Sequence, residues 1–163
     1  MNTLNKSIQG KDTTHIHNVE EIYSLRAKYI MIHPNIKPSK FDPLSPKNIF
    51  LDGFHNIDGM KALLKSLPKN RKILICSFLN NKKYIQMLSN LSNYFNKIIV
   101  VKMNEENSIT ENLLPKYLKL YFANSLIESF KTINKYSSKQ TSVYFGGSLY
   151  FIGEVLKLNQ SKA

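Results

Sequence analysis

Short runs of consecutive apolar residues alternate, from residue 49 onward, with longer segments in which apolar residues recur every three or four positions. The short runs favour buried strands, and the recurring pattern favours amphipathic helices. Strands are predicted over residues 49–51, 73–78, 97–102 and 142–145. Helices are predicted over residues 57–67, 83–95, 125–136 and 149–158. This alternation predicts an α/β fold, a three-layer Rossmann-like domain with a mostly parallel sheet of about four to six strands.

The apolar stripes of the predicted helices indicate which residues face the core. Helix 83–95 is expected to bury Tyr84, Ile85, Leu88, Leu91 and Phe95. Helix 125–136 is expected to bury Leu126, Ile127, Phe130 and Ile133. The uninterrupted apolar strand 73–78 is typical of a central parallel strand, in which Cys76 is most simply a small core residue. Ser108 and Glu111 have the spacing of a helix capping box.

Residues 1–40 show a different pattern from the rest of the chain. Residues 1–18 are polar, and Val19–Ile32 has the apolar spacing of one amphipathic helix. An extended linker is then punctuated by Pro34, Pro38, Pro43 and Pro46. The sequence therefore predicts an N-terminal extension with a proline-rich linker over residues 1–40 and an α/β domain over residues 41–163.

Length and composition describe a globular protein of 163 residues in which 42% of residues are hydrophobic. Such a chain can bury the core of one domain, and no apolar run approaches the roughly 20 residues of a membrane span. The first residues, Met1 to Lys11, lack the apolar segment of a signal peptide. Cys76 is the only cysteine, which excludes an intramolecular disulfide. These features predict a cytoplasmic protein without a membrane partner.

The formal net charge is +12, which is compatible with nucleic acid, anionic lipid or an anionic small ligand. The lysines are scattered rather than clustered, and arginine, which reads base edges, is scarce. Nucleic acid is therefore disfavoured as a partner. His15 and His17 have the spacing of two metal ligands on a strand, but neither a cysteine nor a cluster of acidic ligands accompanies them. No metal site is predicted.

The most informative polar residues follow the predicted strand 49–51. Asp52, Gly53, His55 and Asn56 stand between this strand and the next helix, and open α/β sheets bind ligands at such strand ends. Asp52 is expected at the strand tip with its carboxylate facing a crevice, and Asn56 is expected to cap the helix. In the simpler alternative, Asp52 accepts hydrogen bonds from nearby backbone N–H groups and His55 is a partly buried turn residue.

A second turn of this kind, Gly146-Gly147-Ser148, joins the last predicted strand to the last helix. Backbone N–H groups at such a helix start can hold an anion. Equally, the glycines can serve the turn and Ser148 can cap the helix. Both interpretations remain open at this point.

Several segments, in order and with similar spacing from about Phe41 to Leu158, resemble one family. Residues 52–57, Asp-Gly-Phe-His-Asn-Ile, are similar to the Asp-Gly-Ala-His-Asn-Pro segment that opens the C-terminal domain of folylpolyglutamate and dihydrofolate synthases, in the Mur ligase superfamily. Residues 147–155, Gly-Ser-Leu-Tyr-Phe-Ile-Gly-Glu-Val, resemble the closing strand-to-helix segment of that domain. Residues 38–41, Pro-Ser-Lys-Phe, resemble its Pro-Gly-Arg segment. The resemblance implies that the chain has the Mur ligase C-terminal fold.

The full-length family joins glutamate to folate or dihydropteroate with ATP. By the resemblance, Asp52 contacts the ribose of ATP, Lys40 contacts its phosphates in place of arginine, and His55 and Asn56 face the same cleft. Ser148 is a weaker candidate for this site. Phe54 replaces the family's alanine and is expected to crowd the cleft. The family's phosphate-binding loop and Mg²⁺ ligands belong to an N-terminal domain of which this sequence contains nothing.

Three functional hypotheses follow. The first is a C-terminal ligase fragment that is inactive alone and requires a separate chain with the ATP-binding domain, which would also supply the Mg²⁺ site. Folate and glutamate are the substrates of such a complete enzyme. The second is a non-enzymatic module that binds a nucleotide or an acidic partner. The third, a small stand-alone enzyme using Asp52 and His55, lacks a nucleophile or metal set to support it.

Overall fold

The computed structural model of the chain describes residues 48–138 and 140–160, which form five strands, four α-helices and one 3₁₀ turn. In chain order they are β1 (Asn48–Leu51), α3 (Ile57–Ser66), β2 (Lys72–Cys76), α4 (Tyr84–Leu91), β3 (Lys97–Val101), η3 (Glu111–Leu113), β4 (Tyr121–Ala123), α5 (Leu126–Tyr136), β5 (Ser142–Gly146) and α6 (Leu149–Gln160). The candidate helix Val19–Ile32, the histidines at 15 and 17, and Lys40 lie outside the described residues.

The five strands form one parallel sheet in the order β1-β5-β2-β3-β4. The predicted α/β fold with a parallel sheet of four to six strands is therefore confirmed. Strand β2 lies at the centre, paired with β5 on one side and β3 on the other. All five of its residues are buried, as its continuous apolar sequence predicted.

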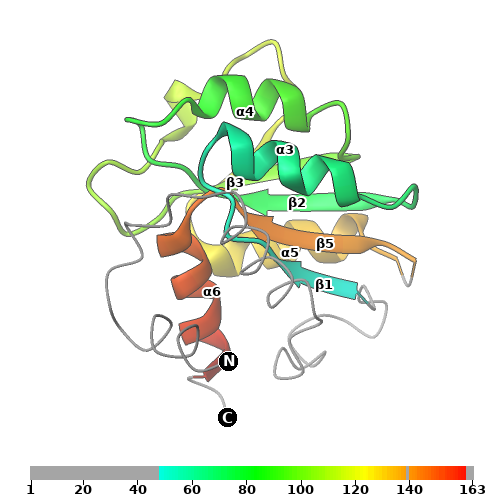
Figure 1. Cartoon of the computed structure of the whole chain (residues 1–163). Helices are drawn as coiled ribbons and strands as arrows, with labels where there is room; N and C mark the ends of the chain where they lie inside the picture. Colours follow the sequence, from blue (N-terminus) through cyan, green and yellow to red (C-terminus); the bar gives the residue numbers. More distant parts are fainter. Residues whose placement is uncertain (1–47, 139, 161–163) are drawn as a thin grey trace, which may run out of the picture.

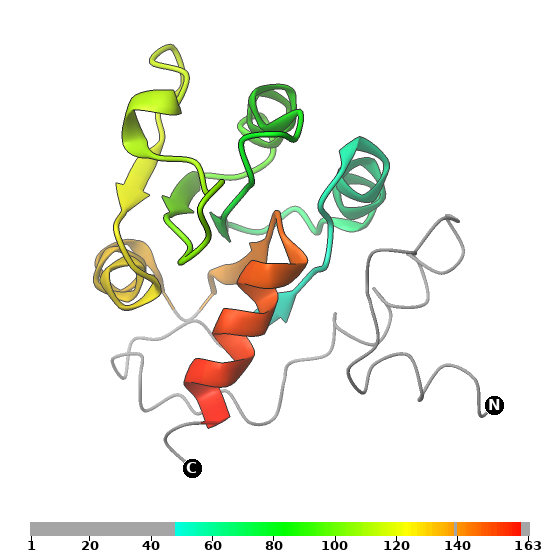
Figure 2. The same ribbon diagram turned by 90° about the vertical axis from the view of Figure 1, so that its left-hand side faces the viewer.

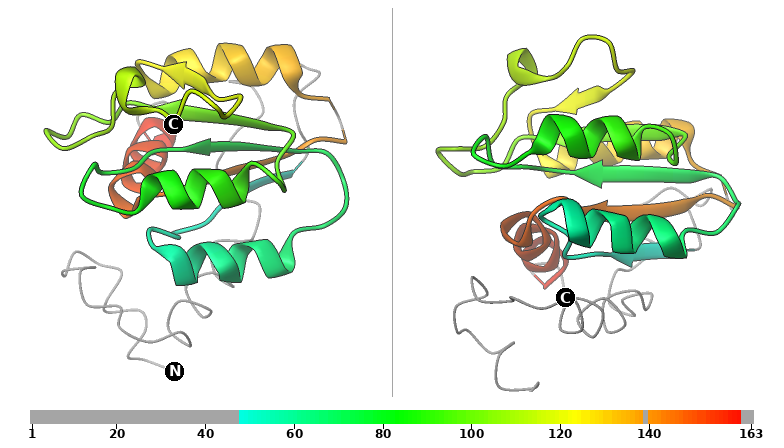
Figure 3. Two further views of the ribbon diagram at one scale, coloured as in Figure 1. Left: turned by 90° about the horizontal axis from the view of Figure 1, so that it is seen from above. Right: turned by 45° about the horizontal axis from the view of Figure 1, so that its top comes forward.

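Helices cover both faces of the sheet, so the domain has three layers. Figure 1 shows α3 and α4 above the sheet, and the left view of Figure 3 shows α5 on the opposite side from these two helices. Alternate residues of each strand point to opposite faces, and this gives two apolar cores. One core joins Ile73, Ile75 and Ile99 to residues of α5 and α6, and the other joins Leu74, Ile98 and Val100 to residues of α3 and α4.

Helix α6 follows β5 in the chain. Figure 2 shows it crossing in front of the carboxyl ends of the strands. Its Phe151 and Val155 are buried in the core shared with α5. Cys76, at the end of β2, is fully buried in the other core. Burial raises the pKa of the Cys76 thiol far above its ordinary value, so this residue remains a neutral core thiol. Its predicted core position is confirmed.

Two helix residues predicted to be buried are exposed. Ile85 is 44% exposed because α4 turns Met87, Leu88 and Leu91 toward the sheet instead. Ile127 is 60% exposed, and the face of α5 that meets the sheet carries Ser129. Ser129 can be buried there because its hydroxyl donates to the backbone carbonyl of Leu126 at 2.6 Å. The predicted apolar stripe was wrong at these two positions. The inward face of α4 carries Met87, and that of α5 carries Ser129, whose hydroxyl is hydrogen-bonded.

The predicted capping box at Ser108 and Glu111 is also wrong. The Ser108 hydroxyl accepts from the backbone N–H of Met103 at 2.9 Å, so it stabilises the loop after β3. Glu111 instead begins the 3₁₀ turn η3, and no α-helix follows it before β4. Strand β4 itself was not predicted from the sequence.

Candidate functional site

The loop after β1, residues 52–56, lies beside the end of β5. The backbone N–H of Asp52 donates to the carbonyl of Phe145 at 2.9 Å, which extends the pairing of the two strands by one residue. From here β1 leads to α3 on one face of the sheet, whereas β5 leads to α6 on the other. Such a divergence between neighbouring parallel strands is where open α/β sheets bind ligands. The fold thus brings the two predicted turns, at Asp52 and at Ser148, to one place.

Asp52 is only 3% exposed, and its carboxylate is turned into the loop. Its Oδ1 atom accepts from the backbone N–H of Phe54 at 3.0 Å. This is the geometry of a turn acid that fixes the chain direction after a strand. The simpler alternative for Asp52 therefore describes its local contact, and a ligand would have to share or displace that contact.

His55 and Asn56 are more accessible, since both are half-buried. The Nδ1 atom of His55 lies 3.0 Å from the carbonyl oxygen of Gly53. A carbonyl only accepts, so Nδ1 carries the hydrogen and Nε2 is the acceptor of the neutral ring. The Oδ1 atom of Asn56 accepts from the backbone N–H of Gly59 at 2.8 Å, which confirms Asn56 as the cap of α3.

Phe54 does not crowd a cleft, contrary to the sequence-based expectation. It is 1% exposed and lies in the core formed with α3 and α4, with its ring centroid 6.2 Å from that of Phe78. The ring can enter because Gly146 has no side chain there: a Cβ atom at Gly146 would lie 2.3 Å from the Phe54 ring. Phe54, which stands where the family has alanine, therefore packs into the core.

The turn after β5 is shaped by packing. Gly147 has a φ of +92°, and a Cβ atom there would lie 2.5 Å from the carbonyl oxygen of Ser77. The carbonyl of Ser148 accepts from the N–H of Ile152, which opens α6, and Ser148 is 4% exposed. Close packing therefore accounts for this glycine, and Ser148 offers little side-chain surface to a ligand.

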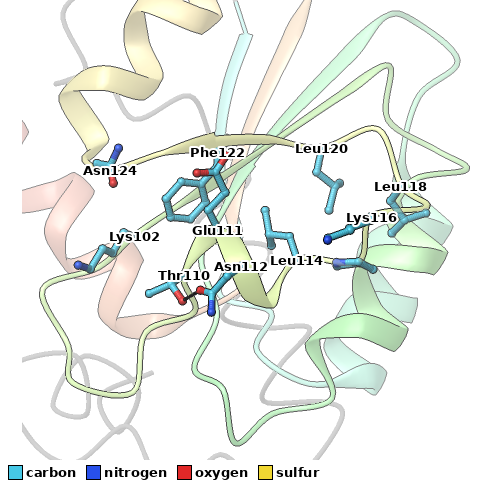
Figure 4. A pocket seen from close by; sticks show the side chains of 11 residues that line it. Lys102, Thr110, Glu111, Asn112, Leu114, Lys116, Leu118, Leu120, Phe122 and Asn124 are labelled. Carbon is cyan, nitrogen blue, oxygen red and sulfur yellow. Dashed lines mark hydrogen bonds between the residues drawn. The ribbon is translucent and has the colours of Figure 1, made fainter.

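A groove of about 740 Å³ lies at the far edge of the sheet, over the segment between η3 and β4. Figure 4 shows Phe122 in its wall with Lys102, Glu111 and Asn124 around it, and Leu114 and Lys116 further along. Strand β4 is at the edge opposite to β1, so this groove is separate from the turns at Asp52 and Ser148. The groove was not predicted from the sequence because its wall depends on β4, a strand that was not predicted either.

Among the described residues, no group of three or more His, Cys, Asp or Glu side chains is placed to hold a metal ion. Within the same part of the chain, no helix has the length and apolarity needed to cross a membrane.

No protein-family profile matches the sequence, and no curated protein sequence matches it. Solved structures do match the fold. Folylpolyglutamate synthase of Mycobacterium tuberculosis, complexed with ADP, superposes with a TM-score of 0.62 at 17% identity, over 69% of this chain and 30% of that chain. FolC of E. coli, in complex with ADP and without folate substrate, gives a TM-score of 0.64 at 20% identity, over 78% of this chain and 32% of that chain.

A third match is the bifunctional folylpolyglutamate synthase/dihydrofolate synthase of Yersinia pestis, complexed with AMPPNP and Mn ion. It gives a TM-score of 0.62 at 16% identity over 75% of this chain and 31% of that chain. The chain thus has the fold of the C-terminal domain of these synthases, as the sequence resemblance implied. It spans about a third of their length.

Proposed function

We propose that this chain is a C-terminal ligase domain of the folylpolyglutamate/dihydrofolate synthase type, which acts only with a separate chain that carries the ATP-binding domain. The complete assembly would add glutamate to folate or dihydropteroate with ATP. The observation that carries this proposal is the position of the Asp52–Asn56 loop, beside the Gly146–Ser148 turn at the divergence of β1 and β5. The loop has this position in a fold shared with synthases solved with ADP or AMPPNP.

The residues of this loop fit a nucleotide in part. His55 and Asn56 are half-buried: Nε2 of His55 can accept from a ribose hydroxyl, and the amide N–H of Asn56 can donate to ribose or phosphate. Asp52 would accept from a ribose hydroxyl only if the ligand reached a carboxylate that is 3% exposed. Lys40 would contribute a positive charge to the phosphates, and Ser148 is the weakest member of the set. Mg²⁺ would come with the ATP-binding chain, because phosphoryl transfer needs the charge neutralisation that a metal supplies.

The proposal is tested by calorimetric titration of the purified chain with ATP, with and without Mg²⁺. The informative variants are Asp52→Asn and His55→Ala. Asp52→Asn keeps an oxygen for the N–H of Phe54 but removes the charge, so this hydrogen bond can still form. Asp58→Asn is the matched control, since Asp58 is an exposed acid in the first turn of α3. If the chain binds ATP at millimolar concentration, and the two site variants weaken this binding while the control does not, the result supports a nucleotide-binding face.

The second arm of the test supplies an ATP-binding domain. The chain is mixed with a separately expressed ATP-binding domain of a folylpolyglutamate synthase, and ATP-dependent glutamate addition is measured. We expect no activity from either chain alone and activity from the mixture. If the mixture stays inactive while ATP binds, the ligase proposal fails and the nucleotide-binding module remains.

The non-enzymatic alternative is favoured by the net charge of +12. A module that docks on an acidic partner through this charge should lose affinity steeply as salt is raised, because screening shortens the range of the attraction. Neutral packing at an interface would show little dependence on salt. Partner binding measured at 50 mM and 300 mM salt therefore separates the two kinds of association.

A further inference from the structure

A cluster of two lysines and two tyrosines, Lys97, Lys135, Tyr121 and Tyr136, lies at the amino ends of β3 and β4, far from the proposed nucleotide loop. Lys97 begins β3, Tyr121 begins β4, and Tyr136 ends α5. The strands are parallel, so all their amino ends lie on one side of the sheet. This cluster therefore lies on the side opposite to Asp52, which follows the carboxyl end of β1. It is independent of the proposed ligase function.

The phenol oxygen of Tyr121 is held by the Lys97 ammonium. The Nζ atom of Lys97 donates to this oxygen at 2.6 Å, and it also lies 4.7 Å from the centroid of the Tyr121 ring and 4.2 Å from that of Tyr136. Two aromatic faces keep the ammonium beside the oxygen. The hydroxyl of Tyr121 donates to that of Tyr136 at 3.5 Å. If Tyr121 loses its proton, the Tyr136 hydroxyl can turn and donate to it, so the phenolate has two donors.

We infer that Tyr121 is a reactive phenol, a site at which activated acyl donors acylate this chain. The Tyr121 hydroxyl first releases its proton to solvent. The phenolate oxygen then attacks the acyl carbonyl carbon and forms the C–O bond of an aryl ester. The bond from that carbon to the leaving group breaks, and the leaving group departs with its electron pair. Lys97 and Tyr136 keep their protons and serve only as donors.

The electrostatics of the cluster agree with this geometry. The hydrogen bond from Lys97 lowers the pKa of Tyr121 below its ordinary value, and the hydrogen bond with Tyr136 and the charges of Lys97 and Lys135 lower it further. Partial burial opposes these effects. At pH 7.5, well below the usual phenol pKa, a lower pKa means a larger fraction of phenolate. Tyr121 should therefore react ahead of tyrosines that are simply more exposed.

The chain offers internal controls for this inference. Tyr117, Tyr150 and Tyr94 are 72%, 56% and 50% exposed, whereas Tyr121 is half-buried. If accessibility governs acylation, Tyr117 should react first. If the Lys97 contact governs it, Tyr121 should react first.

The probe is N-acetylimidazole at a substoichiometric amount and pH 7.5, and the acetylated peptides are counted by mass spectrometry. We expect Tyr121 to be acetylated first. Lys97→Met should slow acetylation of Tyr121 about tenfold, the order expected when a charge-assisted hydrogen bond is lost. Lys135→Met is the matched control, because Lys135 lies over the Tyr136 ring at 5.4 Å, and it should have a much smaller effect.

Two results would overturn the inference: earlier reaction of Tyr117, or an unchanged rate at Tyr121 in Lys97→Met. If Lys97→Met does not fold, the pH titration of phenolate absorbance decides instead. The wild type should then show one tyrosine that ionises before the others, and Tyr121→Phe should remove that step. A titration curve that Tyr121→Phe leaves unchanged in shape contradicts the inference.

Discussion

The contact between Phe54 and Gly146 leads to a double-mutant prediction. Gly146→Ala places a Cβ atom 2.3 Å and 2.7 Å from two carbons of the Phe54 ring, and 3.0 Å from the carbonyl oxygen of Asp52. An aromatic ring cannot bend away, so either the ring or β5 must shift. Phe54→Ala removes both ring contacts and leaves only the one with Asp52. The cost of Gly146→Ala should therefore depend on which residue occupies position 54.

The magnitudes follow from the burial of the ring. Phe54 is 1% exposed, and replacing a buried phenylalanine by alanine costs about 3–5 kcal/mol. Gly146→Ala alone is an overpacking change, which costs about 1–3 kcal/mol. In the Phe54→Ala background the new Cβ atom enters the space left by the ring. The double variant should then be about as stable as Phe54→Ala alone, so the coupling energy is about 1–3 kcal/mol.

The assay is urea unfolding of the wild type, both single variants and the double variant, with extrapolation to zero denaturant. With a slope of about 1–3 kcal/mol per molar urea, Gly146→Ala alone should lower the midpoint by roughly 1 M. Gly153→Ala is the matched glycine control: it lies in α6, and a Cβ atom there meets nothing within 4 Å. That variant should be more stable than wild type by about 0.5–1 kcal/mol, since alanine favours a helix. Equal costs of Gly146→Ala in both backgrounds would refute the packing of Phe54 against Gly146.

Three further predictions concern helices α3 and α5 and the first residue of β2. Asn56→Ala should lower the unfolding free energy by about 1 kcal/mol, because α3 loses its cap, whereas Asn56→Ser should retain most of it; urea midpoints test this. Burial lowers the pKa of Lys72, so the unfolded chain binds more protons between that pKa and 10.5, and stability should rise with pH over this interval. The urea midpoint of wild type should therefore rise relative to that of Lys72→Met between pH 8 and pH 10.5. A difference between the two midpoints that stays constant over this range would contradict the prediction. Ile127→Lys should change the unfolding free energy by less than about 0.5 kcal/mol because the side chain is 60% exposed, against the burial that the sequence pattern indicated; a larger loss in thermal or urea unfolding would restore that interpretation.

Local patterns in the sequence identified the elements that depend on neighbouring residues. The apolar runs located β2 and β3 to within two residues, and the asparagine before α3 was recognised as its cap. These features succeed because strand burial and helix capping are decided by residues close in the chain. The position of Asp52 just beyond the carboxyl end of its strand followed from the same alternation of strands and helices.

Features that depend on distant residues could not be predicted. The insertion of β5 between β1 and β2 is set by pairing across most of the domain. Strand β4 has only three residues, too few for a periodic signal, and it forms because β3 offers a partner. The burial of Phe54 depends on a glycine far along the chain, which explains why a bulky residue in a loop was expected to face outward.

The side chains of Asp52, His55 and Asn56 each make a hydrogen bond to the backbone close by in the chain. Asp52 bonds two residues ahead, His55 two residues back and Asn56 three residues ahead. Because these side chains hold the loop and start α3 without a ligand, the loop should keep its shape whether or not the chain binds ATP. Folding alone therefore explains why these residue types stand at these positions. It follows that the charge of Asp52 is the informative probe: Asp52→Asn keeps an oxygen for the N–H of Phe54, and its effect on ATP affinity, compared with that of Asp58→Asn, tests whether this charge serves a ligand.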